Sequence, residues 1–231
     1  MNQKKIVILT GAGISQESGI TTFRDANGLW ENHDIMEVAS PQGWQKDKEL
    51  VLKFYNQRRK QLLDVQPNDA HFAITKLQEH FDVQVITQNV DDLHERAGNK
   101  KVLHLHGELF KARSEKNEKL IYDWKKDIKL GDTAEDGAQL RPHIVWFGEA
   151  VPMIEKAIPL VQQADIFIIV GTGMQVYPAA GLINYLKENV TIYYIDPKPM
   201  AVYVDNPVAI IEQKAGVGMP VLVEKLINEK Q

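Results

Sequence analysis

The chain has 231 residues, of which 44% are hydrophobic and 25% charged, a composition typical of a folded globular protein. Its 27 Lys and Arg against 31 Asp and Glu give a formal net charge of −4, which argues against nucleic acid as a main partner. The sequence contains no cysteine, which excludes disulfides, catalytic thiols and thiolate zinc sites. The first apolar run is too short for a signal peptide or a membrane span, so we expect a cytoplasmic protein with no membrane association.

Short apolar runs recur along the chain and predict buried strands. They are rich in β-branched and aromatic side chains, which favours strands over helices. The runs are Ile6–Leu9, Val83–Thr87, Val102–Leu105, Ile144–Phe147, Ile166–Val170, Thr191–Ile195 and Val208–Ile211. Between several of them the apolar residues follow a helical period, over 69–80, 151–163, 178–188 and 219–229. This alternation predicts an α/β fold, a Rossmann-like parallel sheet with helices on both faces.

Two stretches interrupt the alternation of strands and helices. Residues 31–66 are helical in pattern and charged, without a strand-like run, and residues 107–141 are dense in charge with a thin apolar stripe. Both are interpreted as insertions beside the sheet. We therefore expect a single domain over 1–231, with a Rossmann-like core of 1–30, 67–106 and 142–231, a helical insertion at 31–66 and a small inserted lobe at 107–141.

A glycine-containing turn follows the first predicted strand. Gly11, Ala12 and Gly13 lie where a glycine lets the backbone approach a phosphate and the next helix offers free N–H groups. The Rossmann fingerprint for dinucleotides needs a further glycine where this chain has Gln16, and an acidic residue at the end of a second strand about 20 residues on. Neither is present. By itself, the turn fits a phosphate loop or a plain strand-to-helix connection.

Five sequence blocks resemble, in order, the motifs of the sirtuins, the NAD-dependent protein-lysine deacylases. They are GAGISQESGITTFRDANGLW at 11–30, TQNVDDLH at 87–94, LHG at 105–107, RPHIVWFGE at 141–149, and GTG at 171–173 with VYPA at 176–179. The resemblance extends over about 6–227. It implies the sirtuin fold, NAD as co-substrate and acyl-lysine proteins or peptides as partners. It also implies transfer of the acyl group to NAD, which yields nicotinamide, O-acyl-ADP-ribose and free lysine.

The resemblance implies roles for individual residues. His106 is expected to be the general base on the ribose hydroxyls, a task that suits imidazole because its usual pKa lies near neutral pH. His104 points to the same face of its strand, so only the motif favours His106. Asn89 is expected to be catalytic, orienting the ribose and nicotinamide together with Asp91. The implied cofactor-binding residues are Gly11, Ala12, Gly13, Ile14, Glu17, Thr22, Phe23, Arg24, Trp30, Gln88, Asn89, Val90, Asp91, Gly171, Thr172, Gly173, Asp196 and Ala215.

An acyl pocket is implied by Tyr55 and Arg58. Three residues apart on a predicted helix, they share one face, and arginine binds a carboxylate through two parallel hydrogen bonds. Judged alone, Arg58–Lys60 would be a solvated basic turn. Within the sirtuins, however, this Tyr-x-x-Arg pair marks the class that removes succinyl, malonyl or glutaryl groups, so we expect removal of such groups and of acetyl. The implied substrate-binding residues are Ala39, Tyr55, Arg58, Val145, Trp146, Phe147, Gly148 and Glu149, of which the last five are expected to form a strand edge for the peptide.

Two other functions remain open at this point. One is mono-ADP-ribosyl transfer by the same cleavage of NAD. The other is a non-catalytic module that binds NAD or ADP-ribose, although the presence of His106 and Asn89 is evidence against it. Most sirtuins carry four zinc-binding cysteines within what is here 107–141, where this chain has residues such as Ser114 and Lys116. We therefore expect no zinc, and a lobe held by its own apolar stripe and backbone pairing. The oligomeric state is left open, and a monomer is compatible with the sequence.

Overall fold

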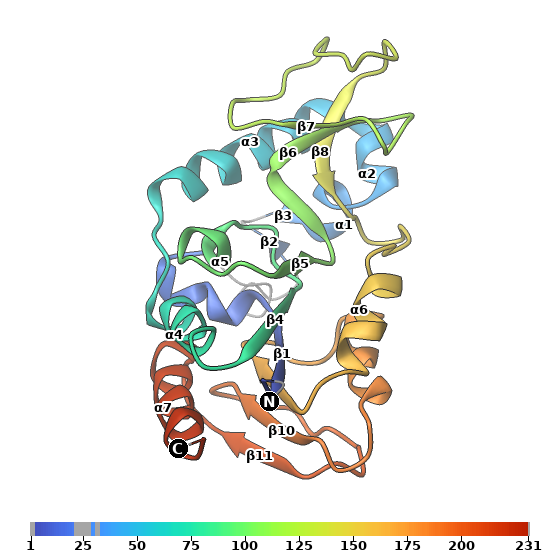
Figure 1. The fold of residues 1–231 in the computed structure, drawn as a ribbon. Coiled ribbons are helices and arrows are strands. Elements are labelled where there is room, and N and C mark those ends of the chain that lie inside the picture. The colour runs from blue at the N-terminus through green and yellow to red at the C-terminus, as the bar shows by residue number, and fades with distance from the viewer. Residues whose placement is uncertain (1–2, 21–28, 31–32, 231) are drawn as a thin grey trace.

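The computed structural model describes residues 3–20, 29–30 and 33–230 (Figure 1). Its central sheet has six parallel strands in the order β11-β10-β9-β1-β4-β5. The strands are β1 (Lys5–Thr10), β4 (Asp82–Thr87), β5 (Val102–His104), β9 (Ile166–Val170), β10 (Thr191–Ile195) and β11 (Val208–Ile211). Six of the seven predicted strands lie in this sheet, and the predicted α/β fold class is confirmed.

Strand β1 lies in the middle of the sheet and is buried on both faces. Its side chains alternate, so that Ile6 and Ile8 pack against one pair of helices, α4 (Asp69–Leu77) and α7 (Ala215–Asn228). Val7 and Leu9 point to the opposite face and pack with α6 (Ile154–Val161) and the 3₁₀ helix η4 (Ala179–Tyr185). Figure 1 shows α4 and α7 on one side of the sheet and α6 on the other. A continuous apolar run is what such a two-sided environment requires.

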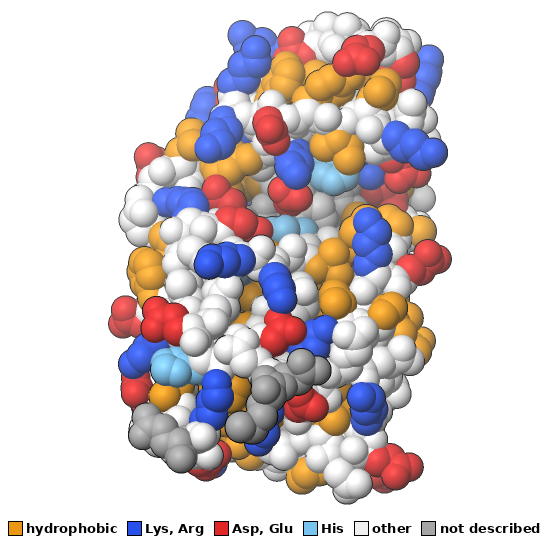
Figure 2. Space-filling model, in the orientation of Figure 1, with side chains coloured by type: hydrophobic (Ala, Val, Ile, Leu, Met, Phe, Trp, Pro, Cys, Tyr) orange, Lys and Arg blue, Asp and Glu red, His pale blue; other side chains and the backbone are white. Residues whose placement is uncertain are grey.

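Helices are present at all four predicted segments: α4 and α6 are shorter than predicted, whereas α7 begins four residues earlier than the predicted 219. The segment predicted as a helix over 178–188 is the 3₁₀ helix η4, in which Gly181 lowers the preference for an α-helix. No helix in the described part of the chain is long and apolar enough to cross a membrane. Figure 2 shows acidic and basic side chains interspersed over the visible face rather than gathered by sign.

The direction in which the chain crosses the sheet changes next to β1. From β1 the chain continues to β4 and β5 on one side, and later to β9, β10 and β11 on the other. The loops after β1 and β9 meet at this point, where the Gly13 N–H donates to the Gly171 carbonyl at 2.8 Å. In open α/β sheets the crevice outside the strand ends at such a switch point is where ligands bind. The topology therefore positions a site at the carboxyl ends of the strands.

The helical insertion and the small lobe pack together beside the sheet. The hairpin β2 (Leu29–Trp30) and β3 (His33–Asp34) precedes three helices, α1 (Ile35–Val38), α2 (Pro41–Lys46) and α3 (Lys48–Asp64). The lobe holds an antiparallel sheet of β7 (Ile121–Asp123), β6 (Gly107–Ser114) and β8 (Leu140–Ile144), in that spatial order. Side chains of α3 and of this sheet share one apolar core. The remaining short helices are η1 (Ala12–Ile14), η2 (Gln16–Ser18) and α5 (Leu93–Arg96).

The predicted strand Ile144–Phe147 is wrong. Strand β8 ends at Ile144 and pairs with β6 in the small lobe, and residues 145–149 form a turn. The Glu149 carboxylate closes this turn, because it accepts the Trp146 N–H at 2.8 Å and binds Arg141 Nη1 at 2.7 Å. An apolar run has the same appearance in the sequence whether the strand continues or ends. What ends this strand is the ion pair between Glu149 and Arg141, which lies eight positions earlier.

Candidate active site

Most of the predicted cofactor residues lie at the carboxyl ends of four neighbouring strands. Gly11–Ile14 follow β1, Gln88–Asp91 follow β4, His106 follows β5 and Gly171–Gly173 follow β9. Three predicted residues, Thr22, Phe23 and Arg24, lie outside the described residues, and of Trp30 only the backbone in β2 is described.

The glycines after β1 and β9 allow two backbones to touch. A Cβ atom at Gly13 would lie 2.7 Å from Gly171 Cα, and one at Gly11 would lie 2.6 Å from Thr172 Cβ, both too close for a side chain. Gln88 Nε2 donates to Thr172 Oγ1 at 3.1 Å, which joins the loop after β4 to the same point. The sequence predicted that a phosphate approaches the backbone at these glycines, and what the structure shows there is the close approach of the loop after β9.

The outer predicted cofactor residues lie near α7 and β10. The Glu17 carboxylate accepts the Gly216 N–H at 2.7 Å, next to buried Ala215, so it caps the N-terminus of α7, where a negative charge is favourable. Asp196 is buried just after β10, and its Oδ1 accepts the Lys198 N–H at 2.9 Å. Glu17 therefore has a structural contact that its place in the motif did not indicate.

A hydrogen-bonded chain links Asn89 and Asp91 through Ser15. Asn89 Nδ2 donates to Ser15 Oγ at 3.1 Å, and Ser15 Oγ donates to Asp91 Oδ2 at 3.0 Å. Burial raises the pKa of Asp91, while hydrogen bonds from the Leu93 N–H and the Ser15 hydroxyl act in the opposite direction. Ser15 is not among the site residues predicted from the sequence, although it lies within the first motif, which was the available signal.

His106 is oriented by one hydrogen bond. Its Nδ1 lies 2.9 Å from the Gln88 carbonyl oxygen. A carbonyl only accepts, so Nδ1 carries the hydrogen, and in the neutral ring Nε2 keeps its lone pair. Burial lowers the pKa of His106, partly offset by the bond to Gln88. At neutral pH the ring is therefore uncharged and can accept a proton at Nε2.

The two predicted acyl-pocket residues are both buried on α3. Trp146 Nε1 donates to Tyr55 Oη at 3.0 Å, and burial raises the pKa of Tyr55, so its side chain stays a phenol. Arg58 is 8% exposed and borders a cavity of about 30 Å³ whose other walls include Val90 and Asp91. The cavity therefore connects the arginine on α3 with the loop after β4.

The turn at 145–149 differs from an open strand edge. The Val145 N–H donates to the His106 carbonyl, and the Phe147 N–H donates to the carbonyl of buried Ala39, both at 2.9 Å. Trp146 is buried, whereas Phe147 and Gly148 are exposed. With the bonds from the Trp146 N–H to the Glu149 carboxylate and from the Glu149 N–H to the Trp146 carbonyl, four of the five backbone donors expected to receive a peptide are bonded within the protein, and the exposed part of the turn is limited to its tip.

The residues of the small lobe do not fit the four-cysteine zinc site that most sirtuins carry. Residues 107–141 are all described, and across the described residues no three His, Cys, Asp or Glu side chains group as metal ligands. Ser114 Oγ donates to Asp136 Oδ2 at 2.7 Å and accepts the N–H groups of Lys116 and Asn117 at 3.1 Å each. These hydrogen bonds join the end of β6 to the segment before β8.

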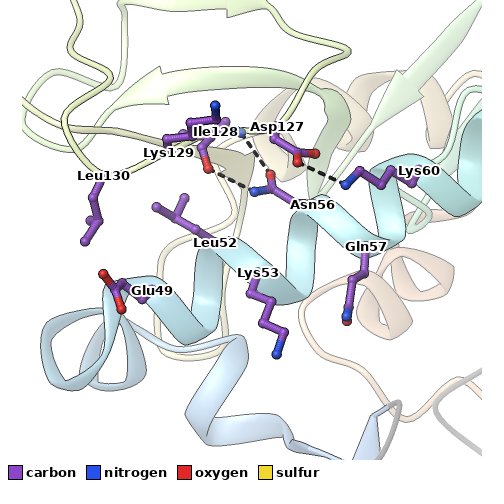
Figure 3. Close-up of a pocket in the computed structure, with 10 residues that line it drawn as sticks. All are labelled: Glu49, Leu52, Lys53, Asn56, Gln57, Lys60, Asp127, Ile128, Lys129 and Leu130. Atoms are coloured by element: carbon purple, nitrogen blue, oxygen red, sulfur yellow. Dashed lines mark hydrogen bonds and ion pairs between the residues drawn. The ribbon is translucent and has the colours of Figure 1, made fainter.

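A larger cavity of about 410 Å³ lies between α3 and the loop at 127–130 (Figure 3). Asn56 Nδ2 donates to the Ile128 carbonyl and Asn56 Oδ1 accepts the Ile128 N–H, both at 2.9 Å. Lys60 and Asp127 form an ion pair at 3.0 Å beside them. None of the predicted site residues lines this cavity, and its polar contacts attach the lobe to α3.

A family model described as the Sir2 family matches residues 11–178. The chain belongs to this family. Among its Sir2 relatives, an NAD-dependent protein deacylase of Helicobacter pylori is 59% identical over 97% of this chain and 98% of that protein. One of Bacteroides thetaiotaomicron is 51% identical, again over 97% and 98%. The crystal structure of a Sir2 homologue in complex with NAD is 37% identical, with a TM-score of 0.86 over 99% of this chain and 91% of that one. The sirtuin resemblance of the sequence motifs is thus confirmed.

Proposed function

We propose that this Sir2-family chain removes acyl groups that end in a carboxylate, of the succinyl or malonyl type, as well as acetyl groups, from lysine side chains. Its general activity is that of its family and relatives, an NAD-dependent protein deacylase acting on acyl-lysine proteins. The preference for acidic acyl groups rests on a single observation, the buried pair Tyr55 and Arg58 on α3, of which Arg58 borders a cavity with the loop after β4.

The chemistry of the Tyr55 and Arg58 side chains supports this preference. A guanidinium forms two parallel hydrogen bonds with a carboxylate, and these are stronger where water is excluded. Arg58 borders the same small cavity as Asp91, and at about 30 Å³ this cavity has room for the carboxylate end of an acyl group beside Arg58 rather than for the whole chain. Tyr55 lies one helical turn earlier on α3, where burial keeps its side chain a phenol.

Asp91, which lines that cavity, is proposed to act together with His106 and Asn89 at the carboxyl ends of β4 and β5. When bound, NAD supplies the ribose that receives the acyl group and the nicotinamide that leaves. His106 is proposed to accept a ribose hydroxyl proton at Nε2, because its Nδ1 hydrogen is engaged by the Gln88 carbonyl. Asn89 and Asp91, held by Ser15, are proposed to orient the ribose and the nicotinamide. The residues fit NAD because the loops after β1, β4 and β9 converge at the switch point of the sheet.

The test is Arg58→Met, which keeps an apolar stem and removes the guanidinium. Hydrogen bonds to a charged group contribute about 1.5–3 kcal/mol, so kcat/KM for a succinyl-lysine peptide should fall about 10- to 150-fold. The value for the acetyl-lysine peptide should change little. The readout is NAD-dependent release of nicotinamide with each peptide.

Lys60→Met is the matched control, because Lys60 lies on the same helix in an exposed ion pair with Asp127. Equal losses on both peptides with Arg58→Met would refute the carboxylate preference. Label from NAD attached covalently to protein, without loss of the acyl group, would instead indicate ADP-ribosyl transfer.

A further inference from the structure

Two histidines near the end of β5 hold successive carbonyl groups of the loop after β4. His106 Nδ1 donates to the Gln88 carbonyl at 2.9 Å, and His104 Nδ1 donates to the Asn89 carbonyl at 3.0 Å. His104 also has a partner at its other ring nitrogen, since Nε2 lies 2.8 Å from Glu95 Oε1 at α5. The His104 side chain is 8% exposed, so little water competes with either contact.

Both partners of His104 are acceptors. A carbonyl oxygen and a carboxylate oxygen cannot donate, so the two hydrogen bonds form together only when each ring nitrogen carries a hydrogen. The ring is then an imidazolium whose charge is balanced by Glu95. Burial acts to lower the pKa of His104, but the hydrogen bond and the charge of Glu95 outweigh it, so that pKa is raised. His106, with a neutral carbonyl as its partner, has a lowered pKa instead.

We propose that His104 is a positioning residue, which as an imidazolium paired with Glu95 fixes Asn89 for its work on the ribose and nicotinamide. The Asn89 N–H donates to Thr87 Oγ1 at 3.0 Å, and Asn89 Nδ2 donates to Ser15 Oγ at 3.1 Å. His104 holds the carbonyl of the same residue from β5. The backbone of Asn89 is thus held on both sides, which limits rotation of the peptide unit that follows it.

The charge of His104 depends on groups from three parts of the fold. Glu95 of α5 and Glu108 of β6 favour the charged ring, and Asp91 of the loop after β4 also interacts with it. His94 of α5 lies near enough for the two rings to disfavour each other's charge. Among these groups only Glu95 is hydrogen-bonded to the His104 ring, so it is the one whose removal should shift the titration of His104 most.

The inference rests on the role proposed above for Asn89, and its first test does not use activity. In the free protein near pH 7, ¹⁵N NMR of the imidazole groups should show both ring nitrogens of His104 protonated, and those of His106 in the neutral Nδ1–H form. Glu95→Gln keeps an acceptor at the same place without the charge, so it should move the titration of His104 to lower pH. A neutral His104 at pH 7 would overturn the inference.

The kinetic test compares three replacements of His104. His104→Ala and His104→Leu remove the bond to the Asn89 carbonyl, and we expect kcat to fall about 10-fold, while KM for the acyl peptide stays near the parent value. His104→Asn places an amide donor near the position of Nδ1 and should restore part of kcat. Unchanged kcat in His104→Leu would refute the positioning role, as would equal losses in the alanine and asparagine variants.

Two controls separate this inference from the proposed function. Glu224→Gln removes a carboxylate from an exposed ion pair with Lys76 on the far helices, and should leave both kcat and the His104 titration unchanged. Asn89→Ala tests the residue through which His104 acts. If Asn89→Ala has no effect, the role proposed for Asn89 fails, and if it abolishes turnover while His104→Leu leaves kcat unchanged, only the positioning inference fails.

Discussion

Replacing Asn56 with alanine should release the loop at 127–130 from α3. The Asn56 amide pairs with both backbone polar groups of Ile128. It donates to the Ile128 carbonyl and accepts the Ile128 N–H, each at 2.9 Å (Figure 3). Its Oδ1 also accepts from Arg59 Nη1 at 2.7 Å. Arg59 is 1% exposed, and burial lowers its pKa to about 10. One side chain therefore connects the lobe, α3 and a buried guanidinium.

The expected loss of stability follows from these three contacts. The two neutral hydrogen bonds contribute about 0.5–1.5 kcal/mol each, and the bond from the guanidinium about 1.5–3 kcal/mol. Asn56 is half-buried, so water can replace part of what is lost, and we expect the free energy of unfolding to fall by about 2–4 kcal/mol. Water cannot replace the lost hydrogen bond of Arg59 in the same way, because its Nη2 already lacks a hydrogen-bond partner among the described residues.

The measurement is urea unfolding followed by tryptophan fluorescence and circular dichroism. Gln57→Ala, at an exposed neighbouring position of the same helix, should change the unfolding free energy by less than about 0.5 kcal/mol. Asn56→Asp keeps the acceptor for Ile128 and Arg59 and loses only the donor, so its loss should be smaller than that of the alanine variant. If Asn56→Ala is as stable as Gln57→Ala, the amide does not hold the lobe.

Two further predictions concern the lobe and the proposed base. Elemental analysis should find no stoichiometric zinc and chelators should leave activity unchanged, because residues 107–141 contain no cysteine and the described residues hold no group of three metal-ligating side chains. Bound zinc, or unfolding by a chelator, would contradict this. For His106, protonation removes the lone pair at Nε2, so kcat/KM should fall as pH drops. Burial lowers the pKa of His106 from its usual 6.5, so the acidic limb of the pH profile should lie below 6.5, and a midpoint at or above that value would refute the argument.

The central sheet could be predicted from the sequence because its signals are local. Runs such as Ile6–Leu9 are continuous and apolar because both faces of a parallel strand are covered, so each run identifies its strand without knowledge of its neighbours. The run at Ile144–Phe147 has the same composition, yet the chain leaves its strand at Ile144. The ion pair of Arg141 and Glu149 causes the difference, and no local pattern of apolar residues encodes it.

The candidate site likewise has features that the sequence predicted and others that only the tertiary structure shows. The order and spacing of the motifs were sufficient to identify the family and to select His106, Asn89 and the glycines after β1. Only the tertiary structure brought Ser15 between Asn89 and Asp91, and gave His104 an acceptor at each ring nitrogen. Sequence patterns report the chemistry and the local conformation of each residue. Protonation and orientation depend on the partners that folding brings within hydrogen-bond distance, and those partners come from other strands and helices.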